Sequence, residues 1–362
     1  MKKILLILLC ASNAGSMAAA PKKPYVIAYY NGNGQSAANY ELNKVTHIIY
    51  SFLHLYGDTL GFSSSGRQQT ALRQLAALKQ TYPQLKVLVS LGGWGGCAPC
   101  SPTFAKAESR KNFAFSVKKI CDEYNVDGID LDWEYPAIKG YPGHAYMPED
   151  KPNFTELVKE LRKALGKKRI VSFAAGGKSE HIEQSIDWKG VMPYVDFANL
   201  MTYDLVGGYA TTTGHHTPLY STSQQKESTD NCVLWLLKNG VEANKLIIGA
   251  AFYGRVFENV GPGCNGRYQA GKFLRGVSYN EQDKYLSPDS GFVQYWDDTA
   301  HAPYAYNASK KLFVTYDNKQ SVAEKVAYMK KYKLGGIMFW VLPEDTYRNG
   351  LLDALDKAME AK

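Results

Sequence analysis

Residues 127–136 carry acidic side chains at alternate positions, a spacing that can serve proton transfer or metal binding. The segment reads Asp-Gly-Ile-Asp-Leu-Asp-Trp-Glu-Tyr-Pro, and the alternation runs through Asp130, Asp132 and Glu134. Successive side chains of a β-strand point to opposite faces, so the three carboxyl groups would form one column with apolar side chains on the reverse face. Carboxylates this close repel one another, and their titrations become coupled. The pattern therefore predicts a strand whose carboxyl groups serve proton transfer or metal binding.

The surroundings of this column separate three interpretations. An exposed edge strand would tolerate the charges, but residues 113–126 have a helical pattern that leads into an apolar strand, which indicates burial. Hard cations bind carboxylates, yet no neighbouring histidine or asparagine completes a ligand set locally. Acid–base catalysis fits best, because crowded carboxyl groups push their pKa values apart and one stays protonated. Pro136 would end the strand beyond Glu134, and we expect neither a metal ion nor an organic cofactor.

The acidic strand is one of eight short apolar runs that are bounded by turn-forming residues. Segments of helical period lie between most of them, and such an alternation indicates a parallel sheet. Eight units in one chain predict a closed (β/α)8 TIM barrel, with the site at the carboxyl ends of the strands. The expected strands are residues 25–30, 46–52, 86–91, 128–132, 169–174, 197–201, 246–251 and 336–340, and the expected helices are 68–81, 109–124, 153–165, 228–239, 321–331 and 351–359.

The interval between the seventh strand and the helix at Ser321 breaks this alternation. It is rich in glycine, tyrosine and turn-forming residues. A structureless loop of that length is improbable in a compact domain, so we predict a small α+β insertion between strand 7 and helix 7. The expected organisation is a signal peptide at residues 1–20, a barrel formed by 21–254 and 317–362, and the insertion at 255–316.

The N-terminus has the features of a secretory signal. Two lysines precede a short apolar core, and small residues lead to Pro21. The core is too short to span a bilayer, so we expect cleavage near Pro21, a secreted or periplasmic protein and no membrane span. Cys10 allows a lipoprotein alternative, which we do not favour because Leu9 stands where a small residue is expected.

Composition argues against a nucleic-acid partner. The formal net charge is +8 at pH 7, but no dense run of lysine and arginine is interleaved with aromatic residues. The 26 tyrosines offer apolar rings with polar tips that complement sugar rings, although compositional bias would give the same count. His215 and His216 are adjacent and cannot easily chelate one ion, so we expect them to be solvated or to contact sugar.

The cysteine spacing allows one short disulfide. Cys97 and Cys100 form a Cys-x-x-Cys motif, which serves either as a redox centre or as a stabilising bond. The motif lacks a thioredoxin-like setting, so we favour the bond. Cys121 and Cys232 fall in helical patterns, and we expect them to be buried and inert.

The acidic segment resembles the Asp-x-x-Asp-x-Asp-x-Glu signature of glycoside hydrolase family 18, the chitinase family. All four acidic positions are present, as Asp127, Asp130, Asp132 and Glu134. The resemblance implies that Glu134 is the general acid, that Asp132 and Asp130 share a proton, and that Asp127 is structural. The predicted insertion is similar to one that forms a cleft wall in one branch of this family.

Two further motifs resemble family 18 sequences. Ser90-Leu91-Gly92-Gly93-Trp94 is similar to the Ser-x-Gly-Gly motif, which implies that Ser90 supports the acidic column and that Gly93 and Trp94 line the cleft. Met201-Thr202-Tyr203-Asp204 is similar to the Met-x-Tyr-Asp motif. It implies that Tyr203 binds the acetamido carbonyl of the substrate and takes part in catalysis, while Met201 and Asp204 contact the sugar.

Aromatic residues at other strand ends complete the expected cleft. By the same resemblance, Trp340 forms the floor under the reactive sugar, and Tyr253 with Arg255 contacts sugar hydroxyls. Tyr30 and Phe52 close the first two strands and would flank that floor. The chain departs from the family pattern in its cysteine-containing stretch at 95–102, and it lacks the usual tryptophan shortly after Tyr30.

The resemblance implies a secreted hydrolase that cleaves β-1,4 bonds between N-acetylglucosamine residues in chitin or its oligosaccharides. No second carboxylate is evident as a nucleophile, which fits substrate-assisted cleavage with retention. An endo-β-N-acetylglucosaminidase acting on N-glycan cores is an alternative. A non-catalytic chitin-binding lectin is another, although such relatives typically lose the glutamate that is present here as Glu134. We expect a monomer.

Overall fold

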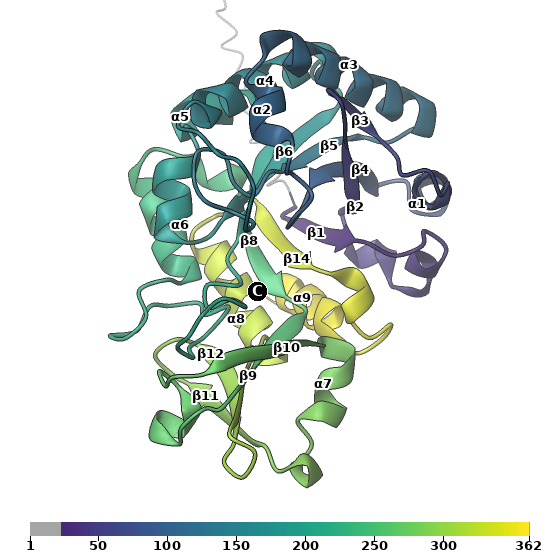
Figure 1. Ribbon diagram of the computed structural model, residues 1–362. Coiled ribbons are helices and arrows are strands. Elements are labelled where there is room, and N and C mark those ends of the chain that lie inside the picture. The colour runs from purple at the N-terminus through teal and green to yellow at the C-terminus, as the bar shows by residue number, and fades with distance from the viewer. Residues whose placement is uncertain (1–22, 362) are drawn as a thin grey trace, which may run out of the picture.

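Eight parallel strands close into a barrel at the centre of the computed structural model, which describes residues 23–361 (Figure 1). The strand order is β1, β14, β8, β7, β6, β5, β4 and β2, and pairing of β1 with β2 closes the ring. The prediction of a (β/α)8 barrel is confirmed. The predicted signal peptide and Cys10 lie outside the described residues. The strands are β1 Tyr25–Tyr30, β2 His47–Tyr56, β4 Lys86–Gly92, β5 Gly128–Asp132, β6 Ile170–Gly176, β7 Phe197–Met201, β8 Leu246–Ala251 and β14 Gly336–Trp340.

Helices surround the barrel, and side-chain caps begin several of them. Ser228 accepts a hydrogen bond from the Asn231 backbone, and Asn318 forms a capping box with Ser321, so both helices start where an oxygen can satisfy a free N–H group. No helix of the described chain is long and apolar enough to cross a membrane. The helices are α1 Arg67–Thr81, α2 Cys100–Phe104, α3 Ala107–Tyr124, α4 Asp150–Leu165, α5 Trp188–Val191, α6 Thr229–Lys238, α8 Lys319–Lys331 and α9 Leu351–Glu360.

The connection between β1 and β2 departs from regular alternation. It contains two short 3-10 turns, Ser36–Asn39 and Leu42–Lys44, in place of an α-helix. Strand β2 also runs past the predicted end at Phe52 and pairs with the short strand β3, Thr59–Gly61, in a hairpin.

Alternation along each strand divides the core into two layers. On β5, Ile129 and Leu131 join the apolar layer between the barrel and its helices, while Asp130 and Asp132 point into the barrel and are buried. Trp133 also packs outward, against Phe104 and Phe154. The alternation of acidic and apolar residues in the sequence therefore correctly predicts that the two types of side chain lie on opposite faces of β5.

A second sheet follows β8 and lies below the barrel in Figure 1. Its antiparallel order is β10, β9, β13, β12 and β11, and an apolar cluster on one face includes Leu286 just after α7. The other face packs against Val206 and Ala210, which follow β7. The predicted insertion is thus present, after β8, which is the seventh strand of the barrel along the chain, and before helix α8. Its exact bounds at 255 and 316 stay a prediction. Its elements are β9 Tyr253–Glu258, β10 Lys272–Ser278, α7 Tyr279–Tyr285, β11 Val293–Asp297, β12 Ala302–Asn307 and β13 Leu312–Thr315.

A buried ion pair fixes the return from this sheet to the barrel. Lys325 of α8 and Asp317 are both fully buried, and their N–O distance is 2.6 Å. Asp317 also accepts hydrogen bonds from the Ala251 backbone at the end of β8 and from Thr217. The end of the insertion is therefore joined to the barrel through a charged group that water cannot reach.

Candidate active site

Asp130 is the innermost member of the acidic column and has a full set of hydrogen-bond donors. Its carboxyl group accepts hydrogen bonds from Tyr29 at 3.0 Å, Ser90 at 3.1 Å, Ser172 at 2.7 Å and Asn199 at 3.2 Å. Burial raises the pKa of Asp130, and these donors oppose the rise. The four donors come from four different strands, so the closed barrel itself holds this carboxyl group in place.

Asp132 has a different environment one step along the column. Its Oδ1 atom is buried, and no residue of the described chain hydrogen-bonds to it. Burial, followed by the charges of Glu134 and Asp130, raises the pKa of Asp132 well above its usual value. A buried oxygen without a donor is costly to leave unsatisfied, so this atom can take a donor from a bound molecule or carry a proton.

Glu134 lies two residues beyond the end of β5 and remains partly exposed. Burial raises its pKa to about 7, the nearby Tyr135 hydroxyl group opposes this rise, and the charge of Asp204 adds to it. A carboxyl group with this pKa is half protonated at neutral pH. Glu134 can therefore donate a proton and later accept one, as general acid–base catalysis requires.

Two glycines allow the neighbouring strand end to approach this column. At Gly92, where φ is +106°, an added Cβ would lie 2.2 Å from the Asp132 carbonyl oxygen. At Gly93, where φ is +78°, it would lie 2.3 Å from the ring of Phe52. Both positions combine a left-handed backbone with close packing, so glycine is required there. The observed contact of Gly93 is with an aromatic ring.

Aromatic rings form the floor next to the acids. Trp340 at the end of β14 stacks on Phe52 with ring centroids 5.6 Å apart and an interplanar angle of 14°. Tyr29 lies 5.8 Å from Trp340 on another side. Trp340 and Phe52 are partly exposed, so part of each side chain can contact a bound molecule.

The structure places Tyr30 differently from the prediction that it flanks this floor. Tyr30 is fully buried in the outer apolar layer, and its hydroxyl group hydrogen-bonds to the Asn33 carbonyl and to Ser36. Alternation along β1 directs Tyr29 inward instead. Tyr29, which sequence reasoning missed, is the tyrosine that contacts both Asp130 and Trp340.

The end of β7 adds polar groups to the same cavity. Tyr203 lies in the inner apolar cluster with Met201, and its hydroxyl group is 3.7 Å from the Met338 sulfur. The next residue, Asp204, has a φ of +54° and accepts two hydrogen bonds from Arg255, at 2.7 and 2.5 Å. Such a paired geometry fixes both side chains.

Asp204 is held in its charged form. Burial raises its pKa, but the His216 ring, with Nδ1 3.6 Å away, and the hydrogen-bonded Arg255 guanidinium outweigh this and lower the pKa below its usual range. Arg255 also lies 4.9 Å from the centroid of the Tyr253 ring. His215 and His216 were expected to be solvated or to contact sugar; both are fully buried, so solvation is wrong and contact with sugar stays a prediction.

Exposed aromatic residues continue the site along the loops. Trp94 is 48% exposed, and its ring lies 5.5 Å from Tyr141 and 6.1 Å from Tyr209. Sequence reasoning missed both tyrosines, because they lie in loops after β5 and β7 where no periodicity marks them. In the sequence, Gly140 next to Tyr141 and Gly207-Gly208 next to Tyr209 indicate only turns.

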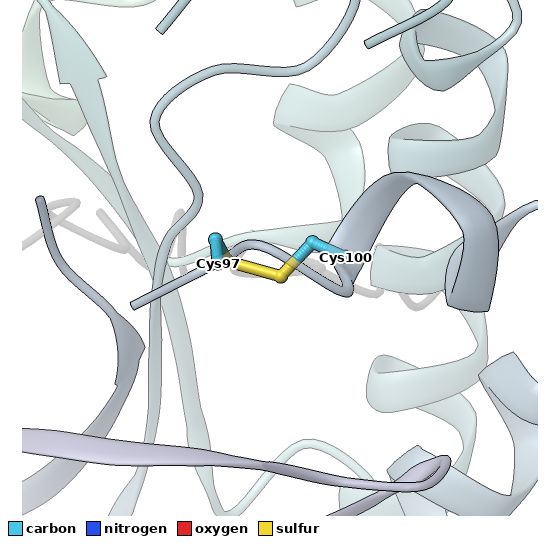
Figure 2. The surroundings of a disulfide bond; sticks show 2 residues. All are labelled: Cys97 and Cys100. Atoms are coloured by element: carbon cyan, nitrogen blue, oxygen red, sulfur yellow. A yellow bond between two sulfur atoms is a disulfide. The ribbon is translucent and has the colours of Figure 1, made fainter. Parts of the chain in front are cut away.

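The predicted disulfide joins the loop after β4 to the first turn of α2 (Figure 2). Cys97 and Cys100 are both buried. Cys121 and Cys232 are buried free thiols, as predicted, and burial raises the pKa of Cys121 to about 12.

Asp127 lies apart from the acidic column. Its side chain accepts hydrogen bonds from Lys79 at 3.0 Å and from the Val87 backbone at 2.9 Å, where β4 and β5 begin. Among the described residues, no group of three or more histidine, cysteine or acidic side chains has the arrangement of a metal site.

Known proteins share this sequence and fold. Chitinase A1 of Niallia circulans is 36% identical over 76% of this chain, which spans only 42% of that protein. Probable chitinase 2 of Drosophila melanogaster is 29% identical over 95% of this chain and 78% of its own length. The structure of a glycoside hydrolase family 18 N-acetylglucosaminidase from Paenibacillus barengoltzii superimposes with a TM-score of 0.84, at 34% identity, over 92% of this chain and 99% of that one.

The sequence profile of one family covers nearly all of the described chain. It matches residues 25–345, from the first barrel strand to the residues just after Trp340, and so includes the acidic column, both glycine and tyrosine motifs and the second sheet. The chain belongs to glycosyl hydrolases family 18.

Proposed function

We propose that this protein is a chitinase that cleaves β-1,4 bonds between N-acetylglucosamine units by a retaining, substrate-assisted mechanism. The carrying observation is the column Asp130, Asp132 and Glu134, in which the outermost carboxyl group has a pKa of about 7. Asp204, a carboxylate at this end of the barrel, is paired with Arg255 and so is not free to attack an anomeric carbon. This pairing supports a nucleophile that comes from the substrate.

The proposed first step uses the proton of Glu134. Glu134 protonates the glycosidic oxygen as the carbonyl oxygen of the 2-acetamido group attacks the anomeric carbon, and the glycosidic bond breaks. The unpartnered Oδ1 of Asp132 accepts the acetamido N–H, which stabilises the cyclic oxazolinium ion, while Tyr203 binds the carbonyl end. Glu134 then removes a proton from water, which opens the ring with net retention of configuration.

The aromatic residues supply the proposed binding surface. Trp340, stacked on Phe52, offers a flat apolar face for the reacting sugar. Arg255, Tyr253 and Asp204 would bind its hydroxyl groups. On the loops, Trp94 with its neighbouring tyrosines would bind sugars on the leaving side of the bond.

Secretion and a monomeric state are part of the same proposal. A polymer such as chitin is met outside the cytoplasm, and the sequence of residues 1–20 has the form of a secretory signal. Expression of the full chain followed by N-terminal sequencing of the exported protein tests this. A new N-terminus near Pro21 is expected.

Two related reactions need the same acid and must be separated by products. An endo-β-N-acetylglucosaminidase would release N-glycans, and an N-acetylglucosaminidase, the activity for which the Paenibacillus barengoltzii relative is named, would release single sugars. The protein should be incubated with chitin hexamer and with a high-mannose glycoprotein. Shorter chitin oligomers without glycan release support the proposal, monomer as the only early product favours the exo reaction, and glycan release favours the other alternative.

A lectin on the same scaffold would bind but not cut. Comparing wild-type protein with Glu134→Gln on chitin hexamer decides this, because a lectin would show equal binding and no cleavage by either protein. Cleavage by the wild-type protein alone is the result expected.

A further inference from the structure

The chain directly after Glu134 is held by a turn from the neighbouring strand. The ring of Tyr135 stacks on that of His181, with centroids 4.2 Å apart and an interplanar angle of 27°. Ser185 donates a hydrogen bond of 2.8 Å to the Pro136 carbonyl oxygen. His181 and Ser185 are the two ends of one π-helical turn, His181–Ser185, which follows β6. The turn thus contacts both residues that follow the acid.

Further contacts hold the turn itself in place. Ile182 is fully buried, its N–H donates to the Lys178 carbonyl at 3.1 Å, and its own carbonyl accepts a hydrogen bond of 2.8 Å from the Trp188 indole. Ser185 is also buried. Because the turn is packed in this way, it can hold Tyr135 and Pro136 in a fixed position, which an exposed loop could not do.

The space for the histidine ring is provided by a glycine. At Gly176, the last residue of β6, an added Cβ would lie 2.0 Å from His181 Nδ1. No atom can approach that closely, so the observed position of the ring requires glycine at 176. The stack on Tyr135 therefore depends on His181, in the turn after β6, and on Gly176, at the end of β6.

His181 does not owe its position to hydrogen bonding or charge. Its Nδ1 atom is buried and has no hydrogen-bond partner among residues 23–361. Burial, with a smaller contribution from Lys178, lowers the pKa of His181 to about 4, so the ring is neutral at pH 7. What the ring supplies is a flat, uncharged surface against Tyr135.

We propose that His181 is a positioning residue that orients Glu134 by packing on Tyr135, with Gly176 providing the space for its ring. This inference rests on the proposed function, in which Glu134 is the general acid. The groups that interact electrostatically with Glu134 are Asp132, Tyr135, Tyr203 and Asp204, and the one that acts on His181 is Lys178.

Three substitutions test this role. His181→Ala removes the surface, Gly176→Ala displaces the ring without removing it, and His181→Phe keeps a flat ring without nitrogen atoms. If His181 acts through shape, the first two variants should lose about 10- to 100-fold in kcat on chitin hexamer with KM nearly unchanged, because small displacements of a catalytic group are that costly. His181→Phe should stay within about threefold of the wild-type protein. His301→Ala, at a partly exposed histidine, is the matched control.

The pH profile gives a readout that a general loss of folding would not move. The nearby Tyr135 hydroxyl group lowers the pKa of Glu134, so releasing Tyr135 should move the alkaline limb of kcat/KM to higher pH in His181→Ala. Circular dichroism should show that the variants fold. If His181→Ala does not fold, His181→Leu keeps the volume but lacks a flat ring, and the same loss is expected.

A titration of Glu134 by carbon-13 NMR, assigned by its absence in Glu134→Gln, separates this inference from the proposed function. If the wild-type protein cleaves no chitin oligomer, the proposed function is wrong, but a pKa shift of Glu134 in His181→Ala alone would still support positioning. An unchanged titration and unchanged kcat in His181→Ala would overturn the inference. A loss in His181→Phe equal to that in His181→Ala would overturn it as well, since the nitrogen atoms would then matter.

Discussion

The three carboxyl groups of the column differ in the hydrogen-bond donors around them. This difference indicates which carboxyl group is more readily protonated. Asp130 accepts hydrogen bonds from four side chains, whereas Asp132 Oδ1 accepts none within the described chain and Glu134 is partly exposed. The donors favour charge on Asp130 relative to Asp132, where burial and two neighbouring acids favour protonation. In the proposed mechanism, a proton carried by Asp132 passes to Asp130 when the substrate supplies an N–H group, because the ionised Asp132 can then accept the hydrogen bond from that group.

Replacing Glu134 tests the acid directly. Glu134→Gln removes the proton donor and little volume, so chitin hexamer should still bind while kcat falls by about 10²–10⁴-fold. In the wild-type protein, kcat/KM should decline as pH rises through about 7, since the acid is then deprotonated.

Glu344 provides the matched control for that pH dependence. Burial raises its pKa to about 7 as well, so it would titrate in the same range. Glu344 interacts with Arg255, so this variant is a control for the pH profile alone, and Glu344→Gln should keep the alkaline limb. Near wild-type turnover by Glu134→Gln, measured by product chromatography, would remove Glu134 from the mechanism.

Replacing Asp132 tests the coupling within the column. Asp132→Asn removes a titrating group whose pKa depends on both neighbours, so kcat should fall and both limbs of the pH profile should move. The profile should be measured on chitin hexamer, with Asp127→Asn as a control at an acid outside the column. A profile of unchanged shape with a lower maximum would mean that Asp132 only supports the chain.

Side-chain period explains which site residues the sequence could predict. Alternation along a strand predicts Asp130, Asp132, Glu134 and the apolar face opposite them. The position of Ser90 near the end of another expected strand, β4, predicts its place in the site. Tyr30 was predicted to face the cleft because it ends its strand, but alternation along β1 places Tyr29 there. His181 lies in a turn, where contacts depend on three-dimensional packing that no local pattern encodes.

At the scale of elements, the short disulfide lies in the loop that carries Trp94. Cys97→Ala with Cys100→Ala should lower the free energy of unfolding by about 2 kcal/mol, because the closed loop is short. Since this loop presents Trp94, KM for chitin hexamer should rise more than KM for trimer. Denaturant unfolding and kinetics on both oligomers check this, with Cys264→Ala, at the exposed free cysteine, as control. Equal changes in the two KM values would show that the bond does not influence binding along the leaving side.

Helix α8 makes a stability prediction through its buried lysine. Lys325→Met leaves Asp317 buried without its cation, and removing one partner of such a pair costs about 3–5 kcal/mol. Urea unfolding should show this loss, while Lys331→Met at an exposed position of the same helix should change stability by no more than about 0.5 kcal/mol. A loss below about 1 kcal/mol would show that the pair contributes little to joining the second sheet to the barrel.

The order of elements was largely predictable, and their connections were not. Apolar runs and helical periods identify the barrel, because each is a local pattern. The strand order of the second sheet depends on pairing between distant segments, such as β9 with β13, and no local pattern indicated the 3-10 turns after β1. The length of the interval indicated that an insertion exists but could not specify its topology.

At the scale of the whole molecule, strands from opposite sides of the barrel contribute to the proposed reaction centre. Asp132 comes from β5, Tyr203 follows β7 and Trp340 ends β14, while Arg255 belongs to the second sheet. This assembly provides several groups suited to the proposed N-acetylated sugar, and its Asp204 carboxylate is already paired with Arg255. The substrate's own acetamide is therefore the element that completes the proposed machinery.

That dependence gives a prediction about the substrate. Chitosan without acetyl groups offers no carbonyl oxygen to attack the anomeric carbon, so it should resist cleavage at enzyme concentrations that digest chitin. A thiazoline analogue of the cyclic intermediate should inhibit, since the site is complementary to that strained species. Proton NMR of fresh products should show the β-anomer first, because two successive displacements retain configuration. Early accumulation of the α-anomer would mean direct attack by water, and Asp132 would then have to activate that water instead of holding the acetamide.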